Sequence, residues 1–124
     1  MPITSFATFT IKPGQVPGAL RLIAAVKRQA EREQPGTLVY LVHRVLDAKG
    51  KPTRQLYFYE RYRGQAALNA HLASSSWQKV LKEWSRYFEG TPVPGKGLSF
   101  FGVERIAAFA RPGAIPSARA RRTA

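Results

Sequence analysis

Histidine is the side chain best suited to proton transfer near neutral pH, and this chain has two, His43 and His71. His71 lies in "YERYRGQAALNAHLASSSW", residues 59–77, three positions after Leu68 in an alanine-rich stretch that predicts a helix. That spacing turns His71 toward the same side as Leu68, away from water. His43 is expected at the surface, at the end of a predicted strand. We therefore predict that His71 is the catalytic base.

A carboxylate comes shortly before this histidine, at the end of an aromatic run. Glu60 follows "LYFY", a composition that predicts a β-strand. We predict that Glu60 orients the imidazole of His71 and fixes its tautomer, which would make both residues part of a catalytic site. A purely structural role fits the same two residues, with a hydrogen bond that ties the strand to the helix. The sequence leaves both roles open.

Aromatic side chains near these residues could line a pocket for a small aromatic substrate. We predict this substrate-binding role for Tyr40, Phe58, Trp77 and Trp84. The spacing of the two tryptophans is equally typical of core packing, because both fall on one apolar stripe at helical spacing.

Several classes of site are excluded by what the sequence lacks. With no cysteine and only two histidines, the chain has few soft metal ligands, and we expect no metal centre. Glycine-rich phosphate loops, paired catalytic carboxylates and nucleophile elbows are also missing, which argues against kinases, glycosidases and hydrolases.

Composition predicts one soluble globular domain. The 124 residues are 44% hydrophobic and 22% charged, and no apolar run is long enough to cross a bilayer, so we expect no membrane partner. The first residues lack the pattern of a secretory signal, which predicts a cytoplasmic protein. The net charge is +13, but glutamates are interspersed among the basic residues. This pattern favours a solvated basic surface over a nucleic-acid site.

Hydrophobic periodicity predicts four strands and three helices. The strands are expected within residues 3–12, 35–45, 54–62 and 98–109. The helices are expected within residues 16–30, within 65–73, and from a capping box of Ser75 and Gln78 to Gly90.

The resulting β-α-β-β-α-α-β order is that of a ferredoxin-like α+β sandwich with a four-stranded antiparallel sheet. Apolar residues occupy both faces of the predicted strands. Val39, Leu41, Tyr57, Tyr59, Phe101 and Val103 alternate with Leu38, Tyr40, Leu56, Phe58 and Phe100. Helices can cover only one face, so we predict that the other face packs against a second copy and forms a dimeric α+β barrel.

Three segments resemble, in order and spacing, the antibiotic biosynthesis monooxygenase family of dimeric α+β barrels. They are "FTIKPG", "QPGTLVYLVHR" and "YERYRGQAALNAHLASSSW", and the resemblance extends over about residues 3–109. It implies a homodimer in which each protomer holds an apolar cavity between sheet and helices. It also implies oxygenation of a quinol-like or polycyclic phenolic substrate by dioxygen, with no flavin, metal or other cofactor.

Three other functions remain open at the level of sequence. The first is a non-catalytic ligand-binding or stress-response barrel, and the second is a haem-degrading barrel with His71 as axial ligand. The third is RNA binding, because "LYFYERY" places stackable aromatics on a strand of a ferredoxin-like fold. The strand lacks the glycine-containing RNA-binding pattern, and a dimer would cover the same face, which argues against nucleic acid.

The sequence divides into a domain over residues 1–109 and a basic Arg/Ala/Pro tail over residues 110–124. The tail has too few large apolar side chains to offset the entropy of ordering. Deleting the residues after Arg111 should therefore change the melting temperature by only a degree or two, measured by circular dichroism. A drop of several degrees would mean that the tail packs on the body or on a partner.

Overall fold

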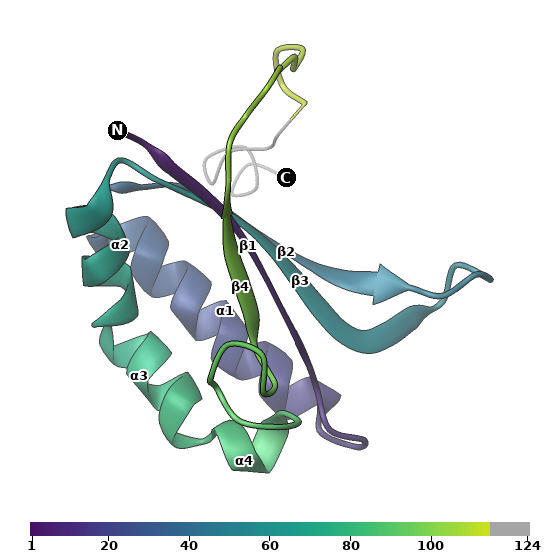
Figure 1. Cartoon of the computed structure of the whole chain (residues 1–124). Helices are drawn as coiled ribbons and strands as arrows, with labels where there is room; N and C mark the ends of the chain where they lie inside the picture. Colours follow the sequence, from purple (N-terminus) through teal and green to yellow (C-terminus); the bar gives the residue numbers. More distant parts are fainter. Residues whose placement is uncertain (115–124) are drawn as a thin grey trace.

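The computed structural model describes residues 1–114 and contains a four-stranded antiparallel sheet in the order β2-β3-β1-β4 (Figure 1). The strands are β1 (Ile3–Thr10), β2 (Thr37–Leu46), β3 (Pro52–Tyr62) and β4 (Ser99–Val103). The helices are α1 (Val16–Glu33), α2 (Gln65–Leu72), α3 (Ser75–Lys82) and α4 (Trp84–Tyr87). The predicted ferredoxin-like α+β fold with an antiparallel sheet is confirmed.

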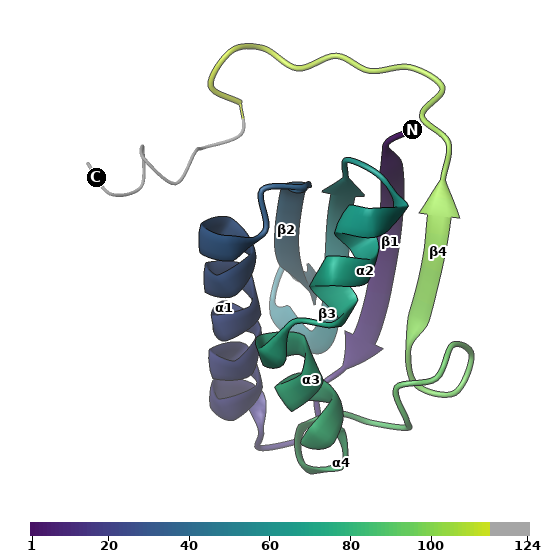
Figure 2. The ribbon, with the colours of Figure 1, turned by 90° about the vertical axis from the view of Figure 1, so that its left-hand side faces the viewer.

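All four helices lie on one face of the sheet. α1 runs over the β2 side, and α2 and α3 run in front of the central strands (Figure 2). The two-residue period of the strands directs every second side chain into the layer between sheet and helices. The buried apolar core consists of Ala7, Phe9, Ile11, Ala19, Leu22, Ile23, Val26, Leu56, Phe58, Val80, Trp84 and Phe88.

Two glycines allow the helices to approach their neighbours closely. A Cβ atom on Gly18 in α1 would lie 2.4 Å from a ring carbon of Tyr87, so α1 and α4 meet where no side chain fits. A Cβ atom on Gly36 would lie 2.6 Å from the Cβ of Ala67, at the junction of the α1–β2 loop with α2. The second contact fixes the start of β2 next to the helix that carries His71.

The prediction of one helix from Ser75 to Gly90 is wrong, because this region forms two helices. The capping residue is Ser74 instead of Ser75, because the hydroxyl of Ser74 accepts a hydrogen bond from the backbone N–H of Trp77 at 3.4 Å. The helix then breaks at Glu83 into α3 and α4. The residue directly after the break, Trp84, is buried in the core with its ring centroid 4.8 Å from that of Phe9 on β1, and its indole N–H donates to the carbonyl of Glu89 at 3.1 Å.

The fourth strand is shorter than predicted. It ends at Val103 instead of continuing to residue 109. Val103 pairs with Thr4, close to the beginning of β1, so the neighbouring strand offers few further partners. Pro2 also lacks a backbone N–H with which to extend the ladder.

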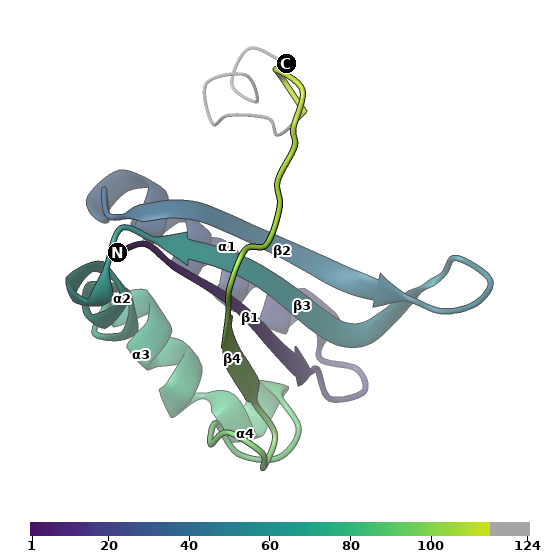
Figure 3. The ribbon, with the colours of Figure 1, turned by 45° about the horizontal axis from the view of Figure 1, so that its top comes forward.

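The second face of the sheet is not covered by any element of residues 1–114 (Figure 3). At its centre the ring of Phe6 lies 5.3 Å from that of Tyr57, 5.4 Å from that of Tyr59 and 5.8 Å from that of Phe101. Phe101 is 47% exposed. We call Phe6, Tyr57, Tyr59 and Phe101 the open-face cluster.

The segment after β4 leaves the body on the side of the open face (Figures 1 and 3). Ile106 and Phe109 in this segment are 87% and 77% exposed. Most of the predicted tail, residues 115–124, lies outside the described residues. None of the helices within residues 1–114 has the length and hydropathy of a membrane span.

We expect the open-face cluster to be the interface of a homodimer, because an exposed aromatic patch on a sheet is stabilised by burial against a second copy. Phe101→Asp would place a charge in that interface, and light scattering should then report one chain mass instead of two. Val93→Asp is the matched control, since Val93 is 48% exposed in the loop before β4. A wild-type chain that stays monomeric at micromolar concentration, or binds single-stranded RNA as a monomer, would contradict this expectation.

Candidate functional site

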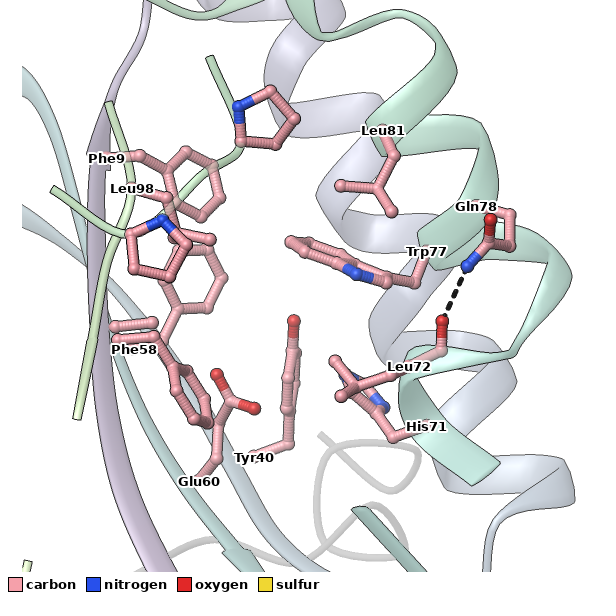
Figure 4. Close-up of a pocket in the computed structure, with 14 residues that line it drawn as sticks. Phe9, Tyr40, Phe58, Glu60, His71, Leu72, Trp77, Gln78, Leu81 and Leu98 are labelled. Atoms are coloured by element: carbon pink, nitrogen blue, oxygen red, sulfur yellow. Dashed lines mark hydrogen bonds between the residues drawn. The ribbon is translucent and has the colours of Figure 1, made fainter. Parts of the chain in front are cut away.

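A cavity of about 340 Å³ lies between the sheet and the helices α2 and α3 (Figure 4). Its wall is largely aromatic and aliphatic, and the loop before β4 closes one side. The lining residues are Ala7, Phe9, Tyr40, Phe58, Glu60, His71, Leu72, Trp77, Gln78, Leu81, Pro92, Pro94, Leu98 and Phe100. A volume of this size lies in the range of small-molecule pockets.

The position of the carboxylate follows from the pleat of β3. Leu56, Phe58, Glu60 and Tyr62 alternate with outward residues and are all buried. The hydroxyl of Tyr62 donates a hydrogen bond to Oε1 of Glu60. Glu60 pairs with Tyr40 on one neighbouring strand and with Ser5 on the other. Its carboxylate points into the cavity (Figure 4).

Glu60 is a buried acid without a salt-bridge partner in the described residues. Burial raises the pKa of the Glu60 carboxyl above its ordinary value, and the hydrogen bond from Tyr62 opposes part of the rise. Within residues 1–114, no Lys or Arg forms a salt bridge with Glu60. Burial and the charge of Glu60 raise the pKa of Tyr40 and of Tyr62, so both hydroxyls stay protonated.

The partner of His71 differs from the prediction. Nδ1 of His71 lies 2.8 Å from Oε1 of Gln34, and Glu60 is instead bonded to Tyr62. The expectation that Glu60 orients the imidazole, or that the two form a direct tie, is therefore wrong for this structure. The reason is geometric, since Gln34 follows the end of α1 and the contact of Gly36 with Ala67 brings this turn against α2.

Gln34 is itself held in place. Its backbone N–H donates to the carbonyl of Ala30 at 3.1 Å, and its carbonyl accepts from the backbone N–H of Thr37 at 2.9 Å. The hydroxyl of Thr37 also donates to Oε1 of Gln34 at 3.3 Å. Because an amide oxygen only accepts, the Nδ1 of His71 carries the proton and Nε2 is the acceptor nitrogen of the ring.

Aromatic rings enclose the imidazole of His71. Its centroid lies 5.3 Å from that of Tyr40, 5.5 Å from that of Tyr62 and 6.5 Å from that of Trp77. The side chain is 3% exposed. Burial lowers the pKa of His71 from 6.5 to about 4, because the charged imidazolium would lose its hydration. The ring is therefore neutral at physiological pH.

The structure brings most of the predicted site residues together. Glu60, His71, Tyr40, Phe58 and Trp77 all line the cavity. The remaining predicted residue, the second tryptophan of the apolar stripe, does not.

That residue is Trp84, which lies in the core with its ring centroid 4.8 Å from that of Phe9 and 4.9 Å from that of Phe88. Its position fits the core-packing alternative that the sequence had left open. His43, predicted at the surface, is exposed on β2.

The hydrogen-bond partners of Glu60 and His71, which are Tyr62 and Gln34, were not predicted from the sequence. Tyr62 could have been found, because it lies two positions after Glu60 on the same strand and therefore on the same face. Gln34 carries no comparable signal, since 37 positions separate it from His71. No cluster of three or more potential metal-ligating side chains occurs within residues 1–114.

The histidine provides a direct test of these surroundings. In an NMR titration, His71 should change protonation near pH 4, and Gln34→Glu should raise that midpoint by placing a carboxylate beside Nδ1–H. A midpoint at or above 6 in the wild type would contradict the burial of the ring.

The same shift predicts how stability depends on pH. The unfolded chain takes up this proton near pH 6.5 and the folded chain near pH 4, so the free energy of unfolding falls as pH is lowered through this window. Glu60, with its raised pKa, acts in the opposite direction. The wild type should therefore lose about 2 kcal/mol more than His71→Gln between pH 7.5 and pH 5, measured by urea unfolding at one protein concentration.

Solved structures share this fold at low sequence identity. PA3566 from Pseudomonas aeruginosa is 23% identical, with a TM-score of 0.67 over 86% of this chain and 95% of that chain. Rv0793 from Mycobacterium tuberculosis is 18% identical, with a TM-score of 0.66 over 89% and 100% of the two chains. NE2512 from Nitrosomonas europaea, a protein of unknown function, is 17% identical, with a TM-score of 0.63 over 90% and 96%.

No curated protein sequence matches the chain. A family profile does, and it covers residues 2–83, which include β1, α1, β2, β3, α2 and α3. The matched region contains both Glu60 and His71 and more than half of the chain. The chain therefore belongs to the antibiotic biosynthesis monooxygenase family.

Proposed function

We propose that the protein oxygenates a phenolic or quinol-like aromatic substrate with dioxygen, in the cavity between the sheet and α2–α3, without a bound cofactor. The observation that carries this proposal is the buried Glu60 carboxylate, which lies in the wall of an aromatic cavity and forms no salt bridge within residues 1–114. Such a group is poised to accept a proton from a substrate hydroxyl or an activated C–H. Membership of the monooxygenase family supports the same reaction class.

Glu60 is a better candidate for the base than His71. A base whose pKa is raised toward neutrality accepts a proton more readily than one whose pKa is lowered to about 4. In this proposal His71 accepts a hydrogen bond from the substrate through Nε2 and positions it. The hydroxyl of Tyr40, which stays protonated, donates to the oxygen anion that forms.

After deprotonation, the substrate itself supplies the electrons for the reaction. An electron-rich phenolate reduces dioxygen directly, and the aromatic wall shields the reactive species from bulk water. In the overall reaction a ring C–H and the phenolic O–H are lost, one oxygen atom becomes a new carbonyl, and the other leaves as water. The four electrons that reduce dioxygen all come from the substrate, so no external reductant is consumed.

The test is oxygen uptake with a panel of quinols and anthrones. Glu60→Gln keeps the size of the side chain and an acceptor for Tyr62, and should lower turnover about a hundredfold or more because the base is lost. His71→Gln should lower it about tenfold, because one hydrogen bond to the substrate is lost. The rate of the wild type should rise with pH as Glu60 ionises, above the ordinary range of a glutamate.

Glu33→Gln is the matched control, since Glu33 is exposed at the end of α1. A larger loss in His71→Gln than in Glu60→Gln would make His71 the base, as the sequence alone suggests. Saturable binding of the panel with no oxygen uptake would favour a ligand-binding protein over an enzyme.

A further inference from the structure

The charge distribution of the cavity is opposite to that of the whole chain. The chain carries a net charge of +13, yet within residues 1–114 no Lys or Arg is among the residues that line the cavity. Glu60 is the one carboxylate that the described part of the chain contributes to that wall, and His71 is held neutral by burial. The cavity therefore presents an acid without a compensating cation.

Its hydrogen-bonding groups are also mostly acceptors. The carboxylate of Glu60 accepts, and the ring of His71 offers Nε2 as an acceptor because Nδ1–H donates to Gln34. The hydroxyl of Tyr40 and the indole N–H of Trp77 are neutral donors. Neutral donors do not offset the repulsion between two like charges in apolar surroundings.

The N-terminus of α3 lies next to the cavity but does not provide an anion site. The backbone N–H of Ser76 donates to Oε1 of Gln29 at 2.9 Å, and that of Trp77 donates to the hydroxyl of Ser74. The backbone N–H of Gln78 donates to the carbonyl of Ser74 at 2.9 Å. These N–H groups are therefore already bonded within the protein.

We infer that the cavity selects uncharged aromatic compounds that carry a hydroxyl donor, and that Glu60 rejects analogues of the same shape that carry a carboxylate. The inference rests on the proposed function and narrows its substrate class. The ligand hydroxyl donates toward Glu60 or Nε2 of His71, and its rings contact Phe58 and Trp77. An anionic ligand would have to bury its charge beside Glu60 without a cation.

The experiment compares three naphthalene probes by calorimetry at pH 7.5 and 0.15 M salt. They are 2-naphthol, which is neutral, 2-naphthoate, which is an anion, and 2-naphthylmethylammonium, which is a cation. The affinity of naphthoate is measured by its competition with naphthol, because competition reports binding in the cavity and not binding to the basic surface. The wild type should bind naphthol at least about a hundredfold more tightly than naphthoate.

Glu60→Gln should reduce that preference to about tenfold or less, because the like charge is gone and only the desolvation of the anion remains. The same variant should bind the cation more weakly than the wild type does, and Glu33→Gln should behave as wild type. If Glu60→Gln does not fold, the wild type alone still tests the inference, because it must bind both the cationic and the neutral probe more tightly than the anion.

Equal affinity of the wild type for naphthol and naphthoate would overturn the inference, as would an unchanged preference in folded Glu60→Gln. Failure of naphthol to bind at millimolar concentration would also overturn it. Absence of oxygen uptake with every phenol, combined with the expected order of affinities, would instead overturn the proposed function and leave the selectivity intact.

Discussion

The burial of the Glu60 carboxylate is the constraint on which the rest of the site depends. A carboxylate on an inward position of β3 costs free energy unless hydrogen bonds compensate for its lost hydration. Tyr62 supplies one such bond from the same strand. Ser5, which faces Glu60 in the register, has a buried hydroxyl with no hydrogen-bond partner in the described part of the chain. A buried polar group next to Glu60 is therefore left without a hydrogen bond.

The histidine is held by a different set of contacts from that carboxylate. Gln34 belongs to the turn between α1 and β2, and its amide oxygen accepts a hydrogen bond from the one N–H that the His71 ring carries. Because the partner is an amide and not an acid, no ion pair within residues 1–114 stabilises a charged imidazole, and burial lowers the pKa of His71. The cavity thus contains one acidic group and one neutral acceptor instead of a coupled pair.

Local periodicity was sufficient to predict β1, β2, β3, α1 and α2, because each has a clear two-residue or helical pattern. It failed where tertiary contacts decide. The sequence through Glu83 keeps its apolar stripe and its helical composition, and the break there accompanies the packing of Trp84 against Phe9 on β1. The Gln34–His71 contact joins residues far apart in sequence, so no local pattern predicts it. The alternation of β3, in contrast, already implied that Glu60 and Tyr62 share a face.

The loop over residues 90–98 supplies one wall of the cavity through Pro92, Pro94 and Leu98. Backbone hydrogen bonds from Thr91 to Lys96, from Lys96 to Val93 and from Gly95 to Leu98 close this loop on itself. The loop therefore holds its shape through its own backbone hydrogen bonds, with Leu98 packed against the core, whereas Glu60 is built into the sheet. Because these bonds lie within the loop, a substitution at Pro92 or Pro94 would change the shape of the cavity wall without removing a hydrogen bond of the sheet, and Glu60 would keep its place on β3.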